Sequence, residues 1–128
     1  MKNITIDINA DIGEGIGNEA ELMPLLSSCN IACGGHAGNF ESMNVCVELA
    51  KQFRVKIGAH PSFPDKTNFG RQIVEMSCSA LYQTVKNQIK DLMNVVRKQH
   101  AALHHVKPHG ALYNLAATDK KTAEVIVE

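Results

Sequence analysis

The chain has 128 residues, and 13 lysines and arginines balance 13 aspartates and glutamates, so its formal net charge is zero with histidine neutral. This balance argues against general nucleic-acid binding, which needs a basic excess. No apolar run approaches the roughly 20 residues of a membrane helix, and the N-terminus does not read as a signal peptide. We therefore expect one globular, cytoplasmic domain that binds neither nucleic acid nor a membrane.

The chain alternates between strand-like and helix-like segments. In chain order we expect a strand at 4–10, a helix at 18–26, a strand at 28–33, a helix at 39–53, a strand at 55–60, a helix from 77 to about 96, a strand at 102–107 and a last helix that begins at 118 or 119. Asn18 with Glu21 has the pattern of a capping box, and Asn39 and Ser77 are expected to cap the next two helices. A Pro-His-Gly turn follows the fourth strand.

Four cysteines lie along these segments, at positions 29, 33, 46 and 78. Cys29 and Cys33 lack the spacing of a zinc knuckle, and Cys46 and Cys78 fall on apolar faces of expected helices. Since nothing points to secretion, we expect four buried, reduced thiols and no disulfide.

Four strands separated by helices predict parallel βαβ units. These units complete either a doubly wound sheet with helices on both faces or part of a βα barrel. Central strands of an open parallel sheet are continuous apolar runs, whereas these strands alternate, with polar residues such as Asp7, Asn30 and Lys56 on one face. The alternation favours the barrel.

The last helix is expected to be apolar, without a Gly, Asn or Pro stop signal after residue 123. Four strands also cannot close a barrel. We therefore expect residues 1–128 to be a single domain, the N-terminal half of something longer.

Polar groups gather where the expected strands end. Because the carboxyl ends of parallel strands meet at one rim, these groups are expected to converge. They are Asn9, Asp11, Glu14, His36, His60, His105, Lys107 and His109. Two kinds of chemistry fit: acid–base catalysis on an amide, with a lysine that stabilises an oxyanion, or a divalent metal held by Asp11, His36 and His60.

Single residues among these also have structural explanations. Asp11 fits a turn, whereas Lys107 ends an apolar strand, where a lysine without a task would be costly to desolvate. Arg71 could grip a carboxylate or phosphate, or it could anchor its loop. His104 neighbours His105 and points to the opposite face, so we expect it to be packed or at the surface.

Five segments carry a more specific signal: residues 7–14 (DINADIGE), 30–38 (NIACGGHAG), 58–65 (GAHPSFPD), 68–71 (NFGR) and 105–114 (HVKPHGALYN). In this order and at these spacings they resemble the LamB/YcsF family, each member of which is the A subunit of a 5-oxoprolinase. The resemblance runs from about residue 4 to the end. It implies an irregular parallel βα barrel of the glycoside hydrolase/deacetylase type, of which this chain would be the first half.

The resemblance also implies an activity: cleavage of 5-oxoproline to L-glutamate, coupled to ATP hydrolysis, together with subunits B and C. On this interpretation Asp11 or His36 would activate water, and His60 and Lys107 would stabilise charge on oxygen. The residues expected to bind substrate are Asn9, Glu14, Arg71, His105 and His109.

The cofactors follow from the same resemblance. The chain has no phosphate loop, so ATP is expected mainly on the partner subunits. Related deacetylases hold a metal through an aspartate and two histidines, which would here be Asp11, His36 and His60. Two alternatives stay open: a metal-dependent amide or deacetylase-type hydrolase that works alone, and a non-catalytic subunit that only binds substrate or assembles the complex.

Overall fold

A computed structural model describes residues 2–128, which form an α/β fold around one sheet of four parallel strands in chain order. The strands are β1 (Asn9–Ile12), β2 (Ser28–Ala32), β3 (Lys56–His60) and β4 (Leu103–Val106). The helices are α1 (Glu19–Leu22), the 3-10 helix η1 (Met23–Leu25), α2 (Phe40–Gln52), α3 (Cys78–Lys98), α4 (Gly110–Ala116) and α5 (Lys120–Val127). The second, third and fourth expected strands are confirmed to within one residue at each end.

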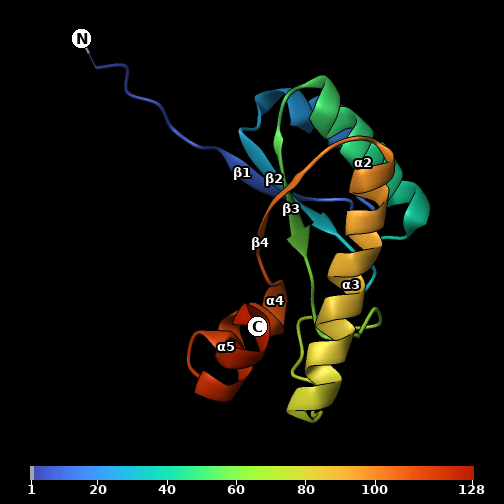
Figure 1. Ribbon diagram of the computed structural model, residues 1–128, viewed down its shortest axis with the longest axis vertical. Coiled ribbons are helices and arrows are strands. Elements are labelled where there is room, and N and C mark those ends of the chain that lie inside the picture. Colours follow the sequence, from blue (N-terminus) through green and yellow to red (C-terminus); the bar gives the residue numbers. More distant parts are fainter. Residues whose placement is uncertain (1) are drawn as a thin grey trace.

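Helices α2 and α3 lie side by side against one face of the sheet (Figure 1). Apolar residues of the strands, such as Ile12, Ile31 and Ile57, form the main core with buried residues of these helices. A smaller core joins the start of α3 to α4 and α5 around Phe63 and Leu112. Within residues 2–128, helices pack against one face of the sheet, and this explains why apolar and polar residues alternate along the strands.

The other face of the sheet carries polar residues in register. Asp11 pairs with Asn30, Asn30 with Gly58 and Gly58 with His105, so these four positions form one row across all four strands. The expectation that polar groups share a face is therefore met, and the row leads to the carboxyl ends of the strands.

Two helices have the caps that we expected, and the last helix starts where we expected it. The Asn39 side chain accepts from the backbone N–H of Ser42 and completes a capping box, and Ser77 accepts from the N–H of Ala80. Asp119 caps the last helix by accepting from the N–H of Thr122. Such local side-chain bonds are what a sequence pattern can predict.

The first strand and the first helix differ from expectation. Residues 4–8 lie outside the assigned strand, which starts at Asn9 opposite Ser28, the first residue of β2. Ile8 still bonds to Ser27 and Ser28, but within residues 2–128 no strand lies beside the residues that precede it. Ile4 and Ile6 are consequently exposed. The helix expected at 18–26 is found as α1 followed directly by η1, but the expected capping box at Asn18 is wrong, since the Asn18 side chain makes no cap bond.

Two further expectations need correction. Helix α4 replaces what was expected to be only a turn after β4. All four cysteines are free, but Cys78 is exposed rather than buried. Cys78 is the first residue of α3, and the smaller core takes in Leu81 and Val85 of this helix but not Cys78. Among residues 2–128, no helix is long and apolar enough to cross a membrane.

Candidate functional site

The candidate site lies at the carboxyl ends of the four parallel strands. Glu14 lies in the loop after β1, His36 in the loop after β2, and His60 is the last residue of β3. Lys107 follows β4 directly, and His109 precedes the first residue of α4. The convergence predicted from the parallel strands is therefore found, although these residues are up to 95 positions apart (14 to 109).

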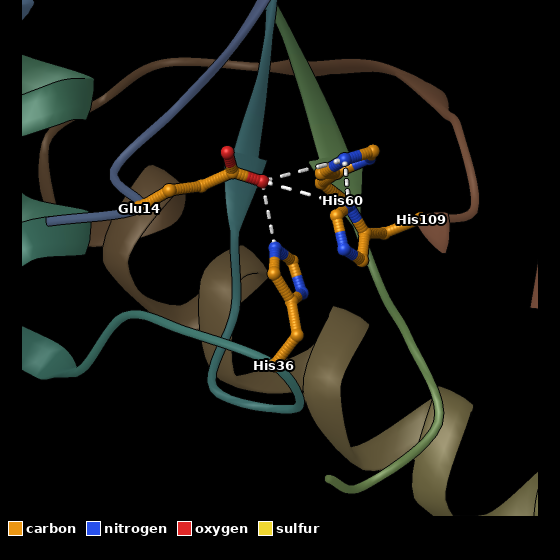
Figure 2. Close-up of side chains that lie close together, drawn as sticks. All are labelled: Glu14, His36, His60 and His109. Atoms are coloured by element: carbon orange, nitrogen blue, oxygen red, sulfur yellow. Dashed lines mark hydrogen bonds and ion pairs between the residues drawn. The ribbon is translucent and has the colours of Figure 1, made fainter. Parts of the chain in front are cut away.

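Three imidazoles surround one carboxylate oxygen of Glu14 (Figure 2). Glu14 Oε1 lies 2.7 Å from His36 Nε2, 3.7 Å from His60 Nε2 and 3.6 Å from His109 Nδ1. The His36 and His109 rings stack face to face with centroids 3.6 Å apart, and His60 meets both edge-on. All three histidines are buried. We call these four residues the Glu–His cluster.

Backbone carbonyls hold two of the rings. His60 Nδ1 lies 2.6 Å from the carbonyl oxygen of Lys107, and His109 Nε2 lies 2.8 Å from that of Phe69. A carbonyl oxygen only accepts hydrogen bonds, so each of these nitrogens carries a proton and donates it. The ring nitrogens left over, His60 Nε2 and His109 Nδ1, both face the interior of the cluster, 3.0 Å apart.

Asp11 and Lys107 form an ion pair beside the cluster. Lys107 Nζ lies 2.9 Å from Asp11 Oδ1, and Asp11 Oδ2 lies 3.4 Å from His60 Nε2. Burial raises the pKa of Asp11, but hydrogen bonds with His60, Asn30 and Lys107 outweigh burial, so its pKa lies well below the usual range. The carboxylate is therefore ionised at neutral pH.

The titration of the cluster follows from burial and close partners. Burial raises the pKa of Glu14, but the hydrogen bond with His36 and the nearby imidazoles lower it more, so the net pKa is lowered. Burial lowers the pKa of His109, and its bond to the Phe69 carbonyl only partly opposes this. At neutral pH the cluster is thus anionic at Glu14 and neutral at His109.

A hydrogen-bonded row connects the site with the polar face of the sheet. His105 Nε2 donates to Asn30 Oδ1 over 2.6 Å, and Asn30 Nδ2 donates to both Asn9 Oδ1 and Asp11 Oδ1, at 2.6 and 2.8 Å. Burial and the neighbouring His104 lower the pKa of His105. His104 itself is exposed, as expected. Asn9 and His105 therefore connect to the Asp11–Lys107 pair only through Asn30.

The 68–71 loop covers the imidazoles. Phe69 packs edge-on against His36 and His109, and the Arg71 guanidinium lies over the Phe69 ring at 5.3 Å. Gly70 has φ +63, and a Cβ there would come within 2.9 Å of His36 Cβ and 3.0 Å of His109 Cδ2. Arg71 thus borders the cluster through Phe69 and is itself exposed.

A pocket of about 360 Å³ adjoins the cluster. Asp11, His60, Lys107 and His109 line it, and Tyr113 of α4 contributes to its wall. This volume is within the roughly 300–1,000 Å³ of small-molecule sites. A small molecule bound here would meet an anion, a cation and two imidazoles.

Three supporting residues were not among the expected site residues. Asn30 ties Asp11 to His105, and Phe69 and Gly70 shape the cover over the imidazoles. Asn30 could have been found, because an asparagine inside an apolar strand needs hydrogen-bond partners. Phe69 and Gly70 lie in the 68–71 segment that contributes to the family resemblance, but their contacts depend on how a long loop folds back, which residue types do not indicate.

The Glu–His cluster could hold a metal ion. Each residue offers one ligand atom, and these atoms all lie within 4.8 Å of one another. The metal ligands expected from the sequence were Asp11, His36 and His60. The cluster contains His36 and His60 of these, together with Glu14 and His109, and Asp11 lies next to the cluster. The fit rests on the chemistry of these donors, since imidazole nitrogens and a carboxylate oxygen are common zinc ligands. His36 Nδ1, which is not the ring nitrogen next to Glu14, is buried and has no hydrogen-bond partner within residues 2–128. A buried polar atom is normally paired.

The fold and the sequence both match known proteins. The solved structure of a lactam utilization protein from Thermus thermophilus is 43% identical, with a TM-score of 0.92. The match covers 96% of this chain and 52% of that one, so this chain spans about half the length of the solved relative. The family model described as LamB/YcsF family matches residues 6–128. Since this match takes in almost every residue, including the whole site, the chain belongs to the LamB/YcsF family.

Proposed function

We propose that this chain carries the lactam-cleaving site of an ATP-dependent 5-oxoprolinase, as its A subunit, and that it acts with subunits B and C. The observation that carries the proposal is the Asp11–Lys107 pair beside His60, on a pocket at the carboxyl ends of the strands. Family membership and the name of the solved relative support a lactam as substrate. 5-Oxoproline is a five-membered lactam with one carboxylate.

The coupling to ATP has a chemical reason. A lactam is an unreactive amide, and transfer of a phosphoryl group from ATP to its oxygen makes the ring carbon electrophilic. One water adds to that carbon and the C–N bond breaks, which frees the amine and leaves an acyl phosphate. A second water displaces phosphate and leaves L-glutamate. One ATP and two waters are consumed, and ADP and phosphate are released.

The residues around the pocket have distinct tasks in this proposal. Lys107 stabilises negative charge on the carbonyl or phosphate oxygens. Asp11 accepts a proton from the attacking water, and its side chain is one-third exposed, whereas that of His36 is fully buried. His60 stabilises charge on the same oxygens, and Arg71 or His109 holds the substrate carboxylate. The nucleotide is assigned to subunits B and C.

The test is glutamate release from 5-oxoproline by this chain mixed with subunits B and C, with and without ATP. We expect release only when the chain, both partners and ATP are all present. Lys107→Met should lower the rate by about 100-fold or more, as for loss of an oxyanion donor. Lys121→Met, an exposed lysine on α5, is the matched control and should leave the rate unchanged. Equal rates for both variants would contradict the role of Lys107.

The Glu–His cluster favours a second candidate, a metal-dependent amide hydrolase that works without ATP. The same assay separates the two. Release that needs an added divalent metal but neither ATP nor the partners would support the second candidate and overturn the first. No release under any of these conditions would contradict both.

A further inference from the structure

Two ring nitrogens face each other inside the Glu–His cluster, and no backbone group of residues 2–128 contacts either of them. His60 Nδ1 and His109 Nε2 each donate their proton to a backbone carbonyl. His60 Nε2 and His109 Nδ1 are therefore the nitrogens left to face an ion. They lie 3.0 Å apart, beside the Glu14 carboxylate.

The third atom at this place is a carboxylate oxygen. Glu14 Oε1 lies 3.6 Å from His109 Nδ1 and 3.7 Å from His60 Nε2 (Figure 2), and the Glu14 side chain is mostly buried. Donors about 2.1 Å from a tetrahedral ion are roughly 3.4 Å apart. The three separations of 3.0, 3.6 and 3.7 Å therefore match the edges of one coordination site.

Outer partners already hold these donors in the orientation that ligation needs. Metal-bound histidines typically donate their other N–H to a carbonyl or carboxylate, which fixes the ring. Lys107 and Phe69 supply such carbonyls to His60 and His109. His36 Nε2, 2.7 Å from Glu14 Oε1, fixes the carboxylate.

We propose that the Glu–His cluster binds one divalent ion of the zinc class through His60 Nε2, His109 Nδ1 and Glu14 Oε1, with His36 as the partner that orients Glu14. Two imidazoles and a carboxylate suit Zn²⁺ and leave a fourth position open. The ligands differ from the Asp11, His36 and His60 set that the resemblance implied. The proposal holds whatever the substrate is, so it stands or falls separately from the proposed function.

The test is calorimetric titration of Zn²⁺ into the EDTA-treated 128-residue chain, with Co²⁺ absorption as a second readout. We expect one equivalent to bind, to raise the temperature of unfolding, and Co²⁺ to give the intense visible bands of a low-coordinate site. X-ray absorption on the zinc-loaded wild type should show imidazole scattering from two rings, which needs no variant to fold.

Variants then identify the ligands. His60→Ala, His109→Ala and Glu14→Gln should weaken binding by more than the roughly 10–100-fold that loss of an outer partner costs, and His36→Ala should stay within that range. His100→Asn is the matched control: it is exposed, has φ +56, and should bind like the wild type. Circular dichroism checks that each variant folds.

Two results would overturn the proposal. The first is no stoichiometric binding to the wild type, which would assign the facing nitrogens to a shared proton. The second is loss of zinc binding in Asp11→Asn together with normal zinc binding in Glu14→Gln. This would show that Asp11, and not Glu14, supplies the carboxylate ligand.

Discussion

Gly58 is the residue that allows His105 to reach across the sheet to Asn30. Gly58 and His105 are paired in the register of β3 and β4, and a Cβ on Gly58 would overlap the His105 imidazole. Gly58→Ala should therefore lower the free energy of unfolding by about 1–3 kcal/mol, as overpacking does. Urea unfolding measures this, and the double variant with His105→Ala should recover much of the loss. A neutral Gly58→Ala would contradict the placement of His105.

Asp11 should make stability depend on pH on the acid side. Its folded pKa lies below the unfolded value of about 3.9, so its contribution is present above that pH and is lost as pH falls toward the folded pKa. The difference in unfolding free energy between the wild type and Asp11→Asn should then shrink as pH is lowered below about 4. Urea unfolding across this range measures it, with Asp91→Asn, an exposed aspartate on α3, as control. A constant difference would contradict the account of Asp11.

At the scale of elements, α3 fixes the loop that follows β3. The buried Gln88 side chain accepts from the backbone N–H of Ser62 and donates to its carbonyl oxygen, at 3.0 and 2.9 Å. Gln88→Leu leaves both groups buried and unpaired, which should cost about 1–3 kcal/mol of unfolding free energy for each unpaired group. Gln83→Leu, on the exposed face of α3, should cost much less in the same thermal or urea unfolding. Equal costs would show that this contact does not hold the loop.

The elements also show what the sequence could predict. Helix starts at Asn39, Ser77 and Asp119 were predictable because a cap bonds to a backbone N–H three residues away. The start of β1 could not be predicted in this way, because it depends on where β2 begins, about 20 residues further along the chain. Helix α4 was missed because it is short, and its first residue, Gly110, reads as part of a turn.

The candidate site was predictable to a similar extent. The parallel strands predicted that the site lies where their carboxyl ends meet. Every expected site residue except Arg71 lies at these strand ends or in the polar row beside them. Which carboxylate meets the imidazoles was not predictable: Glu14 does so from a loop, whereas Asp11 on β1 pairs with Lys107. Side-chain type and strand position do not determine how loops bring a residue back, so the metal set remained open.

At the scale of the whole molecule, apolar surface and open strand edges should make the chain self-associate. Ile4 and Ile6 are 98% and 80% exposed next to β1, and within residues 2–128 both β1 and β4 have a single neighbour in the sheet. Such edges pair readily with other chains. Sedimentation velocity should show association that rises with concentration and falls in the double variant Ile4→Lys/Ile6→Lys. Val127→Lys, a similarly exposed apolar residue in α5, is the control. A monomer at every concentration would contradict this expectation.

The proposed function places lactam cleavage at the carboxyl ends of the strands, around His60. The most direct measurement is glutamate release from 5-oxoproline, with ATP and subunits B and C, by His60→Asn and His100→Asn chains of equal helical content. His60 lines the pocket, whereas His100 is exposed after α3. We predict that His60→Asn lowers the rate by about 100-fold or more and that His100→Asn leaves it unchanged. Equal release by both chains would contradict this placement.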